Sequence, residues 1–457
     1  MSTALYMKGE RPFEAFLSNR PGLAFLCAVF TFLLSSAGII YMYLARKRLQ
    51  LRHFHLIVTM NLVTVLLILV TSEIAMRLLS RPSPQGETLG SMVLTPKNWD
   101  RVARANRQLL DEAASRLSYL IYDDLMGWTV GPNRKSANEL YYSSSEGLRA
   151  PHEGVSLANF TGKARIALVG DSFTFGEEVA YEDTWGHLLE KALGSEYQVL
   201  NAGVGSYALD QAFLRFEKDV RQWNPKVVVF SFISHDVERT MHVYPFLSFP
   251  EWKLPFSKPR LILRDETLKR LNVSPLASDA IFSRKSVFEL PFLEYDKGFS
   301  PDRWQEHVPH LSYLARTFMT MFPPWQAHSP DVSDEARVSV NASIVKAFVQ
   351  SATEAGIIPI VVYFPQAKDL QGPSLPPLGK QVLQRAGIAY TDLTPCLLAV
   401  SPQKRFAPGT HYSQEGNAAV AKCLVGDVRR ALAQASVPHA HGGGAGPSAQ
   451  VLGKPQS

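Results

Sequence analysis

Four short blocks of the sequence carry residue types suited to nucleophilic chemistry. The first is Gly170-Asp171-Ser172, which directly follows the apolar run 164–169. A serine hydroxyl attacks an acyl carbon when a base accepts its proton. The candidate base is His411, which stands just before a long amphipathic segment near the end of the chain. The alternative for the first block is a polar turn that only caps the following helix.

The other two blocks have residues suited to stabilising a negatively charged oxygen. Residues 199–207 pass from an apolar run into a glycine-rich stretch, whose backbone N–H groups can come close to an oxyanion. The run 227–232 ends near His235, whose ring can donate a hydrogen bond. A tight strand–helix turn and an ordinary loop histidine are the alternatives. The candidate oxyanion donors in these two blocks are Gly203, Gly205, Ser206 and His235.

The Ser172 block, the glycine-rich block and the His235 block each follow an apolar run that predicts a strand of a parallel sheet. Continuous rather than alternating apolar strands are expected when helices cover both faces of such a sheet, and ligands bind at the carboxyl ends of its strands. The pattern therefore predicts an α/β domain. The predicted strands are 164–169, 198–200, 227–232, 357–363 and 388–391, and the predicted helices are 184–193, 209–223, 339–355, 377–386 and 414–435.

The domain is expected to span 163–436 and to carry an insertion at about 240–338. The insertion is rich in proline and aromatic residues and too long for a plain loop. A lid or substrate wall over one end of the sheet and mere structural padding are both compatible with it. Before the domain, 81–162 is expected to hold a helical spacer (98–120) and a short hairpin. The Gly/Pro/Ser-rich tail 437–457 is expected to be disordered.

Two long apolar segments precede this domain. Residues 21–45 contain no charged side chain, and neither do 53–72, and about 20 apolar residues span a bilayer. We expect residues 1–80 to contain two transmembrane helices, at about 21–45 and 53–75. Two buried core helices and, for the first segment, a cleaved signal peptide are the alternatives. The short connection carries Arg46, Lys47, Arg48 and Arg52, and such loops stay cytoplasmic. In a bacterium, the domain would then be periplasmic and tethered to the inner membrane.

The composition narrows the class of protein. The chain has 457 residues, 46% of them apolar and 19% charged, which excludes a collagen-like or wholly disordered chain. Its net charge of +6 is too small to indicate nucleic-acid binding. Three cysteines cannot form a disulfide scaffold. Cys396 and Cys423 can pair in an oxidising compartment, although we expect two buried free thiols. No zinc-type spacing of Cys and His is present, so no metal is expected.

Taken together and in this order, the four blocks resemble the SGNH/GDSL hydrolase superfamily over residues 163–435, apart from the insertion. The resemblance implies a three-layer α/β/α flavodoxin-like domain and serine esterase or acyl-transfer chemistry without a cofactor. It implies that Ser172 is the nucleophile and that its N–H is an oxyanion donor. It also implies that His411 is the catalytic histidine and that His235 replaces the family's asparagine donor.

The acid of the site departs from the family pattern. The family usually has an aspartate two or three residues before the histidine, where this chain has Gly409 and Pro408. The site is then either a Ser172–His411 dyad or takes its acid from elsewhere. The candidate is Asp392, at the end of a predicted strand.

A narrower resemblance, to membrane-anchored bacterial SGNH proteins that modify cell-surface polysaccharides, is carried by the motif that continues from Ser172 and by residues 411–417. We therefore expect a membrane-tethered esterase acting on acyl esters of an exopolysaccharide or another envelope glycan, with an acylated carbohydrate or lipid ester as substrate. The alternatives are a polysaccharide O-acyltransferase with the same Ser–His site, or a catalytically degenerate protein that binds glycan or acts as a scaffold.

Overall fold

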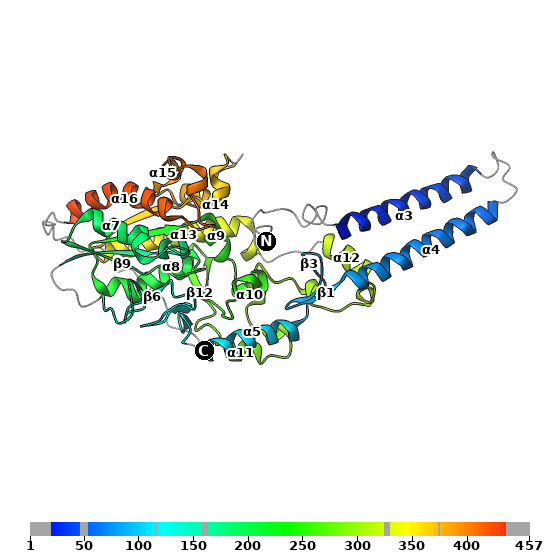
Figure 1. Ribbon diagram of the computed structural model, residues 1–457, viewed down its shortest axis with the longest axis horizontal. Helices are drawn as coiled ribbons and strands as arrows, with labels where there is room; N and C mark the ends of the chain where they lie inside the picture. The colour runs from blue at the N-terminus through cyan, green and yellow to red at the C-terminus, as the bar shows by residue number, and fades with distance from the viewer. Residues whose placement is uncertain are drawn as a thin grey trace.

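The computed structural model describes residues 20–45, 54–115, 117–157, 163–323, 330–372 and 375–435, with side chains of the first helix described from Leu33 onward (Figure 1). A hairpin of two long helices extends away from an α/β domain. The predicted disordered tail, 437–457, and the basic connection, 46–53, lie outside the described residues.

A five-stranded parallel sheet forms the centre of the domain. In chain order its strands are β8, β9, β10, β13 and β14, and in space they run β14-β13-β10-β8-β9. Renumbered along the chain, this is the order 2-1-3-4-5 of the flavodoxin-like doubly wound fold. The predicted fold class of the domain is therefore confirmed. The strands are β8 (Ala164–Val169), β9 (Tyr197–Asn201), β10 (Val227–Phe232), β13 (Ile358–Tyr363) and β14 (Thr391–Asp392).

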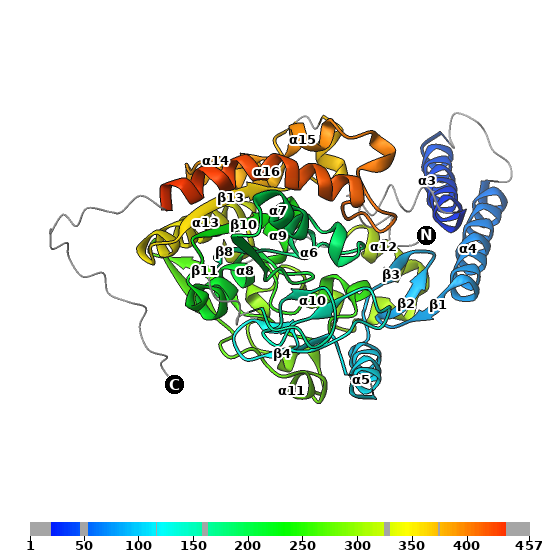
Figure 2. The same ribbon diagram turned by 60° about the vertical axis from the view of Figure 1, so that its left-hand side comes forward.

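Helices cover both faces of the sheet, as the continuous apolar strands predict (Figures 1 and 2). Within β8, Ala167 and Val169 pack toward one face, and Ile166 and Leu168 pack toward the other. The first face is covered by α8 (Leu209–Arg215), α13 (Asp334–Glu354) and α14 (Leu378–Ala386). The second is covered by α7 (Trp185–Leu193), α15 (Thr394–Leu398) and α16 (Gln414–Ala435).

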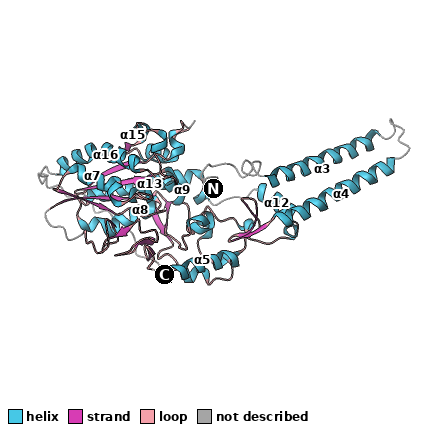
Figure 3. Ribbon diagram, in the orientation of Figure 1, coloured by secondary structure: helices cyan, strands magenta, loops and turns pink. Residues whose placement is uncertain are grey.

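The helical hairpin consists of α3 (Arg20–Ala45) and α4 (Phe54–Leu79), which run side by side (Figures 1 and 3). Within the described residues, one helix is long and apolar enough to cross a membrane, at His55–Leu79, and most of its large apolar side chains are exposed. The described apolar part of α3 is shorter, Leu33–Ala45. The structure thus gives one candidate span and does not support the predicted pair.

The region between the hairpin and the domain is more than a spacer. It contains short antiparallel strands and the long helix α5, whose Trp99 indole donates to the carbonyl of Arg284 at 2.8 Å. Arg107 of α5 donates to the carbonyl of Phe282 at 2.6 Å. These elements are β1 (Arg81–Ser83), β2 (Gly86–Leu89), β3 (Met92–Leu94), α5 (Trp99–Ser115), β4 (Leu120–Asp123), β5 (Gly127–Val130), β6 (Tyr142–Ser143) and β7 (Arg149–Ala150).

The segment 240–338 forms a layer of short elements that packs on α5 through an aromatic core including Trp99, Phe282 and Trp304. A buried ion pair of 2.8 Å between Lys258 and Asp210 joins it to the start of α8. Its main elements are α10 (Pro245–Ser248), the hairpin of β11 (Arg260–Arg264) and β12 (Thr267–Leu271), α11 (Ser278–Phe282) and α12 (Tyr313–Met321).

Cys396 and Cys423 form a disulfide, with Cα atoms 6.5 Å apart. The bond joins α15 to α16, the helix that begins three residues after His411. The expectation of two free thiols is therefore wrong, because the packing of two helices brings residues 27 positions apart within bonding distance.

Candidate active site

Ser172 stands where β8 ends and the short helix α6 (Ser172–Phe175) begins. The carboxylate of Asp171 caps this helix by accepting the N–H groups of Phe173 at 2.9 Å and Thr174 at 3.3 Å. Gly170 is required before it, because a Cβ there would lie 2.3 Å from the carbonyl oxygen of Ser231. The turn thus places the Ser172 side chain at the carboxyl edge of the sheet.

His411 approaches Ser172 from the loop that precedes α16. Its Nε2 lies 2.8 Å from the Oγ of Ser172. Asn417 holds the loop: its amide donates to the carbonyls of Tyr412 and Ser413, and its Oδ1 accepts the N–H of Trp185 at 3.1 Å. The structure therefore brings together the two residues of the predicted nucleophilic pair, although they stand 239 positions apart in the chain.

The acid beside His411 is Glu178, which the sequence analysis missed. Its Oε2 lies 2.9 Å from Nδ1 of His411 and accepts the main-chain N–H of His411, also at 2.9 Å. Its Oε1 accepts the N–H of Gly409 at 2.6 Å. Glu178 has a φ of +70°, a left-handed conformation unusual for a residue with a side chain. The N–H groups of Gly176 and Glu177 donate to the carbonyl of Ser172, so the loop that carries Glu178 stays close to the nucleophile.

Asp392, the predicted acid, does not take this place. Its carboxylate forms an ion pair of 2.7 Å with Lys380 and accepts the N–H of Thr394 at 2.9 Å. Asp392 does lie at the end of β14, as predicted, but on the outermost strand of the sheet. Lys380 of α14 neutralises it there, while Nδ1 of His411 faces Glu178.

A second carboxylate, that of Glu177, lies 3.3 Å from Nε2 of His411 and is partly exposed. It faces Nε2 of the imidazole, the nitrogen that also contacts Ser172, whereas Glu178 faces Nδ1. A Cβ built on Gly205 would be 3.8 Å from this carboxylate. Glu177 therefore lies close to both His411 and the glycine-rich loop.

These carboxylates set the charge state of His411. Burial lowers the pKa of His411, but the hydrogen bond to Glu178 and the negative charges of Glu177 and Asp171 outweigh burial, so the net shift is upward. Burial raises the pKa of Glu178, whereas the ring and main-chain hydrogen bonds from His411 and Gly409 lower it below its usual range. Glu178 thus stays ionised and stabilises the imidazolium.

The candidate oxyanion donors differ in their availability. The N–H of Gly203 is already bonded to Oδ1 of Asn201 at 3.0 Å, and a Cβ on Gly203 would collide with the N of Phe175, 2.5 Å away. Gly203 therefore serves close packing against α6 rather than donation. Within the described chain, the N–H groups of Ser172, Gly205 and Ser206 have no hydrogen-bond acceptor. These three remain candidate donors.

His235 lies in an aromatic environment formed by the insertion. Its ring packs edge-on against Phe249 and Trp252, with centroids 5.4 Å and 5.5 Å away. Burial and the nearby charge of Arg239 hold the pKa of His235 well below its usual range. The ring is therefore neutral and carries one N–H. Its predicted role as an oxyanion donor remains a proposal.

The region preceding the domain supports the acid loop. The phenolic oxygen of Tyr141 accepts the N–H of Glu178 at 2.9 Å. The guanidinium of Arg149 is buried and lies over the rings of Tyr141 and Phe175, at 4.7 Å and 4.8 Å. Arg149 also donates to the carbonyl of Val179 at 3.0 Å. Tyr141 and Arg149 are therefore positioning residues that the sequence analysis did not identify.

Comparison with known proteins gives matches among solved structures only, since no family model and no curated protein matches the chain. Among the solved structures that it resembles are proteins described as G-D-S-L lipolytic proteins, acylhydrolases and esterases. A lipolytic G-D-S-L protein from Desulfitobacterium hafniense is 17% identical, with 57% of this chain and 98% of that chain covered and a TM-score of 0.28. A lipase/acylhydrolase from Enterococcus faecalis is 13% identical, with 58% and 96% covered and a TM-score of 0.29.

A two-domain esterase active on acetylated mannans is 11% identical, with 61% of this chain and 52% of that chain covered and a TM-score of 0.30. The likeness of this chain to these structures is one of fold. The low identities and TM-scores mean that the case for the chemistry rests on the hydrogen bonds of Ser172, His411 and Glu178.

Proposed function

We propose that this chain is a membrane-tethered SGNH-type serine esterase that removes ester-linked acyl groups, with an acylated envelope glycan as its substrate. The observation that carries the proposal is the unbroken chain of hydrogen-bond contacts from Ser172 Oγ to His411 Nε2 and from His411 Nδ1 to Glu178, at 2.8 Å and 2.9 Å. A nucleophile, a base and an orienting acid in this geometry are the requirements of acyl transfer to serine.

In the proposed reaction, the Oγ of Ser172 attacks the ester carbon while Nε2 of His411 accepts the hydroxyl proton. The carbonyl oxygen becomes an oxyanion, for which the N–H groups of Ser172, Gly205 and Ser206 and the ring of His235 are the candidate donors. The imidazolium, paired with Glu178, then returns its proton to the departing alkoxide. Water attacks the acyl-serine in the same way, which releases the carboxylic acid and restores Ser172.

The tethering and location of the domain are supported by two independent features. The candidate span His55–Leu79 is long enough to cross a bilayer, and the basic connection 46–52 favours a cytoplasmic loop, which leaves the domain outside. The Cys396–Cys423 disulfide is typical of an oxidising compartment such as the periplasm. Protease treatment of intact and lysed spheroplasts tests this orientation: the domain should be cleaved in both.

Hydrolysis of 4-nitrophenyl acetate by the purified full chain tests the chemistry. We expect Ser172→Ala to lower kcat/KM by more than about 10³-fold. Equal turnover by the wild type and Ser172→Ala would overturn the proposal. Acetate release from an acetylated polysaccharide, compared with release from a long-chain lipid ester, tests the substrate class. Transfer of the acetyl group to an added sugar in preference to water would identify an O-acyltransferase with the same site.

A further inference from the structure

The helix α12 turns its one charged side chain inward and leaves two aromatic side chains at the surface. Its single charged side chain, Arg316, points inward, where it pairs with Glu87 and donates to the carbonyl of Thr95 at 2.8 Å. On the outward side, Phe318 and Phe322 are exposed by 52% and 51%, with ring centroids 5.1 Å apart. An apolar face normally packs on the core, so this orientation indicates a different neighbour outside.

The apolar surface continues N-terminally from the helix. Val308 and Leu311, in the turn before α12, are exposed by 81% and 76%. Leu311 before α12, Phe318 within it and Phe322 at its C-terminal end are therefore all solvent-exposed apolar side chains of this segment. We call the residues Val308–Phe322 the apolar ridge.

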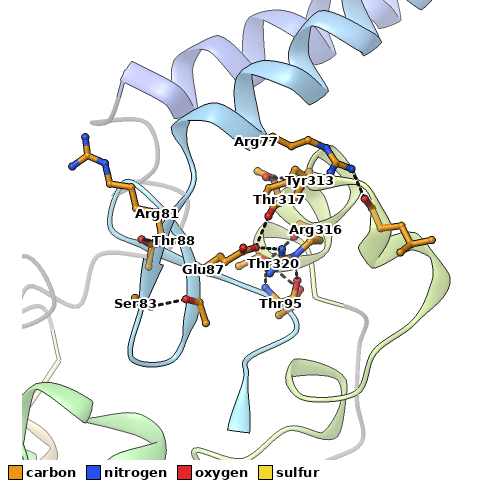
Figure 4. A network of polar contacts seen from close by, with 12 residues as sticks. Arg77, Arg81, Ser83, Glu87, Thr88, Thr95, Tyr313, Arg316, Thr317 and Thr320 are labelled. Atoms are coloured by element: carbon orange, nitrogen blue, oxygen red, sulfur yellow. Dashed lines mark hydrogen bonds and ion pairs between the residues drawn. The ribbon is translucent and has the colours of Figure 1, made fainter. Parts of the chain in front are cut away.

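The apolar ridge is attached to the end of the candidate membrane span (Figure 4). Glu73 of α4 caps α12 by accepting the N–H groups of Tyr313 and Leu314, both at 3.0 Å, and the hydroxyl of Ser312 at 2.8 Å. Arg77, one turn further along α4, donates to the carbonyl of Leu311 at 2.7 Å. The ridge is therefore held at the level of the last two turns of α4.

Polar contacts fix the inner side of α12 to the short sheet that follows α4. Tyr313 donates to Glu87 of β2 at 2.6 Å, and the N–H of Thr95 donates to Thr320 at 2.9 Å (Figure 4). Met76 of α4 is buried together with Leu89 and Leu94, and Leu314 and Met321 pack against them. These contacts hold α12 against α4 and the short sheet, with Phe318 and Phe322 left exposed.

The length of α4 places this junction at a bilayer surface. From Phe54 to Glu73 the helix rises by about 28 Å, which is close to the thickness of about 30 Å of a hydrocarbon core. Glu73 and Arg77 then fall in the headgroup region. Leu78, in the last turn of α4, is also an exposed apolar side chain, by 80%.

We propose that the apolar ridge is a second membrane contact, which lies in the lipid interface beside α4 with Leu311, Phe318 and Phe322 among the lipids. The inference rests on the proposed tethering by α4. It adds that the domain does not swing freely from its anchor: the ridge and α4 together hold it in one orientation relative to the bilayer. A helix lying in the interface buries its apolar face in the boundary between headgroups and acyl chains. The exposed apolar side chains of the ridge, held beside the end of α4, fit such a lipid boundary.

Fluorescence quenching in the full chain tests this contact. In a Cys27→Ser background, a single cysteine is introduced as Phe318→Cys and labelled with bimane, and the protein is reconstituted in phosphatidylcholine vesicles with or without doxyl-labelled lipid. Leu66→Cys, on the exposed lipid-facing part of α4, is the positive control. Glu354→Cys, exposed at the end of α13, is the aqueous control. Phe322→Cys is a second variant in case the first does not fold.

We expect doxyl lipid to lower the fluorescence at 318 and 322 by about twofold or more, as at 66, and to leave that at 354 unchanged. Quenching at 66 without quenching at 318 and 322 would overturn the second contact and leave the tether intact. The absence of quenching at 66, 318 and 322 alike would overturn the tether, and the inference with it.

Discussion

A single oxygen of Glu178 contacts both Nδ1 and the main-chain N–H of His411, at 2.9 Å each. The other oxygen of the carboxylate is held by the N–H of Gly409. Glu178 therefore fixes the position of the histidine backbone as well as the orientation of its ring. With Nδ1–H donating to the carboxylate, Nε2 is left free to accept the proton of Ser172.

Glu178→Gln should lower kcat by about 10²–10⁴-fold, because the neutral amide neither fixes this tautomer nor stabilises the imidazolium. The matched control is Asp392→Asn, which removes the carboxylate that Lys380 neutralises and should change kcat by less than about twofold. Steady-state kinetics on an acetyl ester measure both. The reverse ranking would show that Asp392 and not Glu178 is the acid.

The pH profile of kcat/KM should report the raised pKa of His411. The base must be neutral to accept a proton, so kcat/KM falls as pH drops through this pKa. This fall on the low-pH side is the acid limb of the profile. An upward shift of the pKa moves the acid limb to higher pH. Glu177→Gln removes a negative charge 3.3 Å from Nε2, which lowers the pKa of His411 and moves the acid limb to lower pH. Glu354→Gln, on a helix end remote from the carboxyl edge of the sheet, should leave the limb in place. A limb that moves upward in Glu177→Gln contradicts this electrostatic account.

Tyr141→Phe should lower kcat by up to about tenfold, since the lost hydrogen bond to the N–H of Glu178 lets the strained acid loop relax. The phenyl ring retains the contact with Arg149, so KM and the thermal midpoint should stay close to those of the wild type. Tyr142→Phe removes a neighbouring hydroxyl as the control. An equal loss of kcat in the two variants, or a large fall in the thermal midpoint of Tyr141→Phe, would argue against a positioning role.

The double variant Cys396→Ser/Cys423→Ser should be less stable by about 3–4 kcal/mol, from the entropy of a closed loop of 27 residues. Denaturant unfolding measures this difference. Intact mass of the alkylated, non-reduced wild type should show that neither Cys396 nor Cys423 carries an alkyl group. Alkylation of both without reductant would mean that the thiols are free, as the sequence had suggested.

The nucleophile and the base were predictable from sequence because their signals are local. Ser172 follows a buried strand in a distinctive block, and His411 is followed by the residues, ending in Asn417, that hold its loop. The strand order was predictable only through the family resemblance, because apolar runs give the strands but not their neighbours.

The acid was not predictable in the same way. Glu178 reaches His411 only because the chain takes a positive φ in a loop and folds back beside α6, and neither event has a marker in the residue types. Asp392 had the expected local signal, a carboxylate at a strand end, but the neighbouring Lys380 comes from a different helix. The Cys396–Cys423 pairing and the support from Tyr141 depend on tertiary packing in the same manner.

The most direct test of the account is active-site labelling of the full chain with a fluorophosphonate, followed by peptide mass mapping. The Ser–His–Glu arrangement predicts one phosphonyl adduct, on Ser172, which is absent in Ser172→Ala and strongly reduced in His411→Ala. A folded wild-type protein that remains unlabelled at Ser172, while a known serine esterase in the same mixture is labelled, would contradict the central claim.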